Sequence, residues 1–84
     1  MNDNERKTRK IGRLIFDKVG DMYVFSFSKK HKIVITRYTD RGWVAKEKIL
    51  SPTIKVGGEA LFTTIRACTA ETMTEALDGI LEEI

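Results

Sequence analysis

Residues 22–29 read Met-Tyr-Val-Phe-Ser-Phe-Ser-Lys, and this stretch decides the fold. Aromatic residues occupy positions 23, 25 and 27, and smaller residues occupy the positions between them. A period of two residues is typical of a β-strand that buries one face and exposes the other. The chain is therefore expected to build a sheet around this strand.

Segments of strand character flank it on both sides. The expected strands are residues 11–19, 33–39 and 43–50, and the expected turns are residues 20–21, 29–32 and 40–42. The Gly20-Asp21 pair suits a tight hairpin, because glycine accepts a positive φ without a Cβ clash. Ser51-Pro52 is expected to end the fourth strand, since proline cannot donate a hydrogen bond to a ladder. Four strands with short turns predict an antiparallel meander.

Residues 54–68 leave two alternatives open. Gly57-Gly58 marks a break, and residues 60–67 beyond it alternate as a strand would. The same residues place Leu61, Phe62 and Ile65 on one side, as a short helix would. The run Thr63-Thr64-Ile65 favours a fifth strand.

The C-terminal residues carry the pattern of an amphipathic helix. Its apolar stripe consists of Met73, Ala76, Leu77, Ile80, Leu81 and Ile84. Its acidic residues, which point away from the stripe, are Glu71, Glu75, Asp78 and Glu82. Thr69 or Thr72 is expected to cap the helix, and Thr72 has capping-box spacing to Glu75. Gly79 would permit close approach to the sheet. The predicted fold class is α+β, a small antiparallel four- to five-stranded meander with one C-terminal amphipathic helix packed on a face.

The chain length fits one domain. The 84 residues divide into a flexible basic arm, residues 1–10, which lacks apolar periodicity, and a single α+β domain, residues 11–84. The phenylalanines at positions 16, 25, 27 and 62 are expected in the core. Cys68 is the sole cysteine, and no apolar run approaches the length of a membrane span, so we expect a cytoplasmic protein without disulfides or membrane contact.

The residues that carry chemistry are too few for an active site. The chain has one histidine, His31, which is expected to be solvated in a turn, and one cysteine, Cys68, which is expected to be buried. A zinc site needs three or four such ligands, and nucleophilic catalysis needs a third group to orient the base. We therefore expect neither an enzyme nor a metal or other cofactor.

Charge is divided unevenly along the chain. Residues 1–58 hold 14 Lys or Arg against 6 Asp or Glu, whereas residues 59–84 hold one Arg against 6 acids. The candidate nucleic-acid-binding residues are Arg6, Lys7, Arg9, Lys10 and Arg13 in and after the arm, Lys29, Lys30 and Lys32 in a turn, and Arg37, Tyr38, Arg41, Trp43, Lys46 and Lys48 around one hairpin. Cationic side chains neutralise phosphates and aromatic rings stack on unpaired bases.

The faces of that hairpin depend on the length of its loop. A loop with an even number of residues would put Trp43 and Tyr38 on one face, opposite Arg37 and Lys46. An odd, bulged loop would put Trp43 with Arg37 instead. Either arrangement leaves Lys46 and Lys48 together.

The stretch Lys32-Ile33-Val34-Ile35-Thr36-Arg37-Tyr38, followed by a basic strand, is similar to the middle of a known domain type. With the meander, the C-terminal helix and the basic arm, it resembles the positive-cofactor-four family of single-stranded-DNA-binding domains. Residues 51–68 depart from that family, which passes almost directly from its last strand into the helix. The resemblance implies single-stranded DNA binding on a fold of this kind.

Two hypotheses of function follow. The first is a small nucleic-acid-binding protein, single-stranded or non-specific, such as a viral accessory protein of a phage or a mobile element. The alternative is a protein-interaction module, an inhibitor, adaptor or assembly subunit, that uses a sheet edge or the acidic helix. A homodimer is expected in either case, because a small isolated sheet leaves two edges open.

Overall fold

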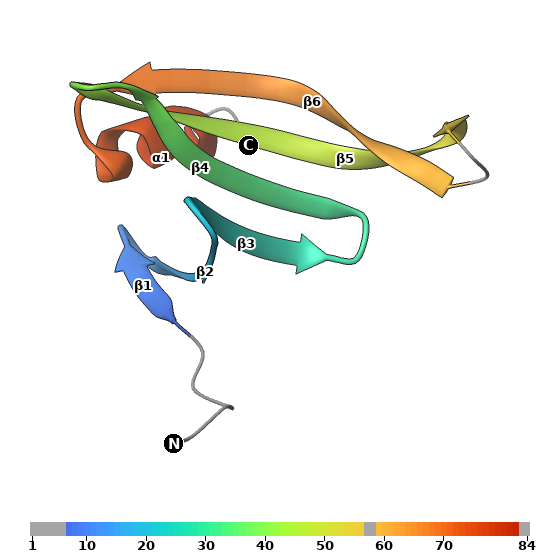
Figure 1. Cartoon of the computed structure of the whole chain (residues 1–84), viewed down its shortest axis with the longest axis horizontal. Helices are drawn as coiled ribbons and strands as arrows, with labels where there is room; N and C mark the ends of the chain where they lie inside the picture. Colours follow the sequence, from blue (N-terminus) through green and yellow to red (C-terminus); the bar gives the residue numbers. More distant parts are fainter. Residues whose placement is uncertain (1–6, 57–58, 83–84) are drawn as a thin grey trace.

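The computed structural model describes residues 7–56 and 59–82, which form an antiparallel sheet followed by one helix (Figure 1). The elements are β1 (Thr8–Ile11), β2 (Leu14–Val19), β3 (Met22–Ser28), β4 (His31–Thr39), β5 (Gly42–Val56), β6 (Glu59–Ala70) and α1 (Met73–Leu81). The strands lie in chain order, each antiparallel to the next, so the predicted meander and α+β class are confirmed. The sheet has six strands rather than four or five.

One additional strand comes from the N-terminal side. Gly12 adopts a φ of +60° and lets the chain turn back, so that the expected strand over 11–19 divides into β1 and β2. Residues 8–10, expected in the flexible arm, therefore belong to β1, and the amide of Lys18 donates to the carbonyl of Lys7. Sequence periodicity misses β1 because Ile11 is its one buried residue. The rest of the expected arm, residues 1–6, lies outside the described residues.

The other additional strand is β6, which confirms the strand alternative for residues 60–67. The prediction that Ser51-Pro52 ends this strand was wrong: β5 continues through both residues, and only its pairing with β6 is interrupted there. Ser51 pairs with Leu61 and Lys55 pairs with Ala60, so residues 52–54 have no ladder partner in β6. A proline fits there because no ladder hydrogen bond is required of its nitrogen. The expected break at Gly57-Gly58 lies outside the described residues.

The helix α1 covers one face of the sheet and closes the core, as predicted. Its buried residues are Met73, Ala76, Leu77 and Ile80, and they pack on Phe16, Ile33, Ile35 and Ala45. The hydroxyl of Thr72 accepts the Glu75 amide at 3.1 Å, which confirms the N-cap. Within the described ranges, no helix is long and apolar enough to cross a membrane.

Gly79 permits a close approach between helix and sheet, as expected. A Cβ added to it would collide with the Cys68 side chain, so Cys68 packs directly against the helix backbone. We call the face covered by α1 the helix face and the opposite one the open face. Phe16 lies in the core and Phe25 packs against it, whereas Phe27 is largely exposed and Phe62 lies outside the core cluster. The core prediction was therefore wrong for Phe27, which α1 does not cover, and for Phe62, which pairs with Leu50 on the face opposite α1.

Candidate nucleic-acid interface

Three lysines gather at the centre of the open face. Lys32 in β4 and Lys48 in β5 are direct cross-strand partners, and Lys46 lies two residues before Lys48 on the same strand and face. We call Lys32, Lys46 and Lys48 the lysine cluster. All three side chains are half-buried. The prediction that Lys46 and Lys48 share a face is confirmed, and Lys32, expected in a turn, joins them because β4 begins at His31.

The immediate surroundings of the lysine cluster are neutral. Its cross-strand neighbours are Ser26, Val34, Thr64 and Ala67. The ion pairs recorded within the described part of the chain both belong to Glu47, which lies on the helix face. Like charges directly opposite one another destabilise a sheet. The cluster is thus a concentration of positive charge that an anion would relieve.

An aromatic ring borders the cluster. Phe62 in β6 pairs with Leu50 and lies on the open face, where Lys32 Nζ sits 4.0 Å from its ring centroid. A cation at this distance over a ring is attracted by the ring's quadrupole. Sequence reasoning missed this contact, because the register shift between Glu47 and Lys48 sets the facing of β6.

The hairpin between β4 and β5 has the odd, bulged form. The register shifts between Arg37 and Thr39, so Arg37 pairs with Trp43 and both lie on the helix face. The guanidinium of Arg37 stands 4.3 Å from the Trp43 ring centroid. The structure therefore does not bring Arg37 and Trp43 into one groove with Lys46 and Lys48.

A second cationic and aromatic group occupies the helix face near this hairpin. Arg9 lies 5.9 Å from the ring centroid of Tyr23, and the Tyr23 and Trp43 rings meet edge to face at 6.4 Å. A cavity of about 430 Å3 beside them is lined by Lys18, Asp21, Thr36, Arg37 and Trp43. Asp21 offsets part of this charge, so the positive character is weaker here than at the lysine cluster.

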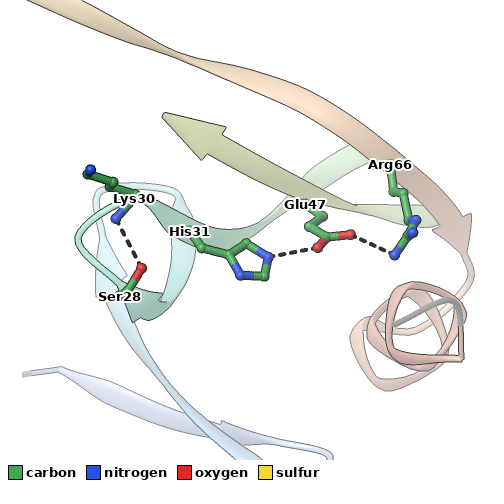
Figure 2. A network of polar contacts seen from close by, with 5 residues as sticks. All are labelled: Ser28, Lys30, His31, Glu47 and Arg66. Carbon is green, nitrogen blue, oxygen red and sulfur yellow. Dashed lines mark hydrogen bonds and ion pairs between the residues drawn. The ribbon is translucent and has the colours of Figure 1, made fainter. Parts of the chain in front are cut away.

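The remaining predicted residues are dispersed. Lys29 and Lys30 are exposed in the turn between β3 and β4, where the Lys30 amide donates to Ser28 Oγ (Figure 2). Tyr38 and Arg41 are exposed at the end of the β4–β5 hairpin, and Lys7 and Lys10 are exposed at the β1 edge. Arg13 lines a cavity with Asp78 and Glu82 near the end of α1. Arg6 lies outside the described residues.

A buried carboxylate joins three strands on the helix face (Figure 2). Glu47 is 3% exposed, and its two oxygens contact His31 Nε2 at 2.7 Å and Arg66 Nη1 at 3.2 Å. The Phe27 ring stacks on His31 with centroids 4.4 Å apart. His31 is therefore not the solvated turn residue that was expected. Sequence reasoning missed this network, because its members are 16 and 19 residues apart and belong to no local pattern.

This network spans three strands of the sheet. The carboxylate is fully occupied by two partners, so it ties β4, β5 and β6 together. The histidine and the cysteine of the chain have different neighbours, because His31 contacts Glu47 whereas Cys68 packs against Gly79. No cluster of three metal-ligating side chains occurs among residues 7–56 and 59–82.

Comparison with known proteins returns no relative. No protein-family model, curated protein or solved structure matches the chain. The resemblance to the positive-cofactor-four family stays an expectation, and β6 stands between the fourth expected strand and the helix, where that family has almost no intervening chain.

Proposed function

We propose that this protein binds nucleic acid without sequence preference, through phosphate contacts of the lysine cluster on the open face. The observation that supports this most is the direct opposition of Lys32 and Lys48, with Lys46 beside them and neutral neighbours around them. Such an arrangement destabilises the isolated sheet and is relieved by a polyanion.

The distribution of acidic side chains favours the approach of a nucleic acid to the open face. The acidic side chains in α1 and next to its ends are exposed, on the side of the sheet opposite the lysine cluster: Glu71, Glu75, Asp78 and Glu82. A polyanion is repelled by that side and attracted to the open face. A helix carrying these charges is also unsuited to the DNA major groove, so we propose backbone contact rather than base reading.

The number of lysines sets the salt dependence and the affinity that we expect for nucleic-acid binding. Three phosphate contacts give a salt dependence, log K against log salt, of about −2 for single strands and nearly −3 for duplex DNA. Affinity of this kind is modest, with a Kd of roughly 1–100 μM at physiological salt. The exposed Lys29 and Lys30 would steepen the slope if the nucleic acid reaches the β3–β4 turn. We also propose a cytoplasmic location, where such ligands are present.

The test is fluorescence anisotropy with labelled single- and double-stranded oligonucleotides from ~50 to ~200 mM salt. Lys46→Glu should weaken binding and lower the salt slope by about one or more. Lys18→Glu is the matched control, because it makes the same charge change at an exposed site on the helix face. Absence of binding at the lowest salt, or an equal loss of affinity in both variants, would exclude the lysine cluster as the binding site. Circular dichroism of both variants controls for folding.

A further inference from the structure

We propose that the outer edge of β6 pairs with β6 of a second copy of this chain, antiparallel about a two-fold axis near Ile65. The dimer interface does not depend on the proposed function. Its consequence for binding rests on that function, because the dimer would join two lysine clusters into one surface. Two features of the molecule support this interface: the difference between the two edges of the sheet, and the end of the helix face that α1 leaves uncovered.

The two edges of the sheet differ in how they are protected. The β1 edge is four residues long, and two of its residues, Arg9 and Lys10, are basic. The β6 edge runs for twelve residues, and two of them, Glu59 and Arg66, are charged. Arg66 is paired with Glu47 of its own chain. Natural proteins shield open edges with shortness and charge, so β1 is shielded and β6 is suited to pairing.

Apolar side chains are exposed on β6 and on the neighbouring strand β5. Ile49 is 38% exposed, Leu61 42% and Ile65 46%. By register, Ile49 and Leu61 lie on the helix face. The nine residues of α1 span only about 14 Å. Because Gly79 holds α1 against Cys68, the opposite end of β6 extends beyond the helix (Figure 1).

A two-fold axis near Ile65 would pair the open β6 edge and also cover the exposed apolar residues. Antiparallel pairing sets the Cys68 end of one β6 beside the Leu61 end of the other. The second copy's α1, which lies over its own Cys68 end, then flanks the uncovered apolar residues. A peptide from another protein could pair with the edge but would bring no helix to this position, and we therefore commit to a second copy. The bulge at Ile65, between the Glu47–Arg66 and Lys48–Thr64 pairs, lies at this axis, so the ladder between the two copies forms on either side of it.

The same symmetry extends the proposed binding surface. A two-fold axis that pairs edge strands antiparallel stands perpendicular to the sheet, so the two open faces lie on the same side. The two copies of β5 are then three strand spacings apart, about 14 Å. The lysine clusters would form one continuous cationic surface across the dimer.

The test is the solution mass of the full chain by sedimentation equilibrium over a range of concentrations. The unmodified protein should reach twice the 9.6 kDa of one chain. Ile65→Lys places a charge on the paired edge and should weaken association by at least about tenfold, the effect of a lost contact worth ~1.4 kcal/mol. Ile15→Lys is the matched control and should not change association, since Ile15 is 63% exposed on β2, away from either edge.

A second measurement locates the interface. Amide exchange of residues 61–70 should slow as protein concentration rises, because outward-facing amides become hydrogen-bonded only in the pair. A monomer at every concentration, or a dimer equally sensitive to both variants, overturns the proposal. The oligonucleotide assay separates the two hypotheses: monomeric protein whose binding is weakened by Lys46→Glu keeps the proposed function, and a β6-dependent dimer without binding keeps only the interface.

Discussion

Replacing Gly79 with alanine tests how closely the helix and the sheet are fitted. An added Cβ would collide with Cys68 Sγ and lie 3.0 Å from Cys68 Cβ. Overpacking of this kind costs about 1–3 kcal/mol, whereas alanine in place of glycine inside a helix contributes about 1 kcal/mol. We therefore expect Gly79→Ala to lower the free energy of unfolding by up to about 2 kcal/mol. At about 4–8 °C per kcal/mol, the largest expected loss corresponds to a Tm lower by about 8–16 °C.

A double-mutant cycle isolates the collision from the change in helix propensity. Cys68→Ala removes the sulfur, so Gly79→Ala in that background should be close to neutral or stabilising. The expected coupling between the two sites is about 1–2 kcal/mol, within the range found for residues in contact. Urea unfolding of all four proteins, followed by circular dichroism, measures it. The fitted contact is refuted if Gly79→Ala has the same effect in both backgrounds to within about 0.3 kcal/mol.

Three further predictions concern other contacts of the fold. Glu47→Gln should lower the free energy of unfolding by about 1–3 kcal/mol, because the carboxylate offers His31 and Arg66 one oxygen acceptor each whereas the amide offers a single oxygen, and an unchanged urea midpoint would contradict this. Phe16→Ala should cost about 3–5 kcal/mol, since Phe16 is 0% exposed, whereas Ile15→Ala next to it should stay within about 0.5 kcal/mol; similar losses at both sites would show the register of β2 to be wrong. Arg37→Ala should cost no more than about 1 kcal/mol and shift the fluorescence of Trp43, while oligonucleotide affinity changes little; a large loss of affinity would move the binding site to the helix face.

Local periodicity was enough to predict much of the fold. The alternation over residues 22–29 corresponds to β3, and the apolar stripe from Met73 corresponds to α1 with Thr72 as its N-cap. Both segments turn one face toward the same core, so their patterns record the packing directly. The sequence did not predict β1, because an edge strand held mainly by backbone hydrogen bonds needs no apolar alternation.

The candidate site was less predictable than the fold. Lys46 and Lys48 share a face in any register, but their pairing with Lys32 depends on where β4 begins. The position of Arg37, on the helix face with Trp43 rather than on the open face with these lysines, depends on one bulged residue in a turn, which composition does not determine. The Glu47 network joins three strands, and no single segment carries a sign of it.

Because the turn between β4 and β5 is bulged, the number of residues in it matters to the fold as much as the identity of the core residues does. Because Arg37 pairs with Trp43 across it, deleting one residue from this turn would rotate the following strand by half a turn about its own axis. Ala45 and the Glu47 carboxylate would then point to solvent, and Lys46 and Lys48 would be driven against the helix. Related sequences should therefore vary freely in the residue types of this turn while keeping its number of residues constant.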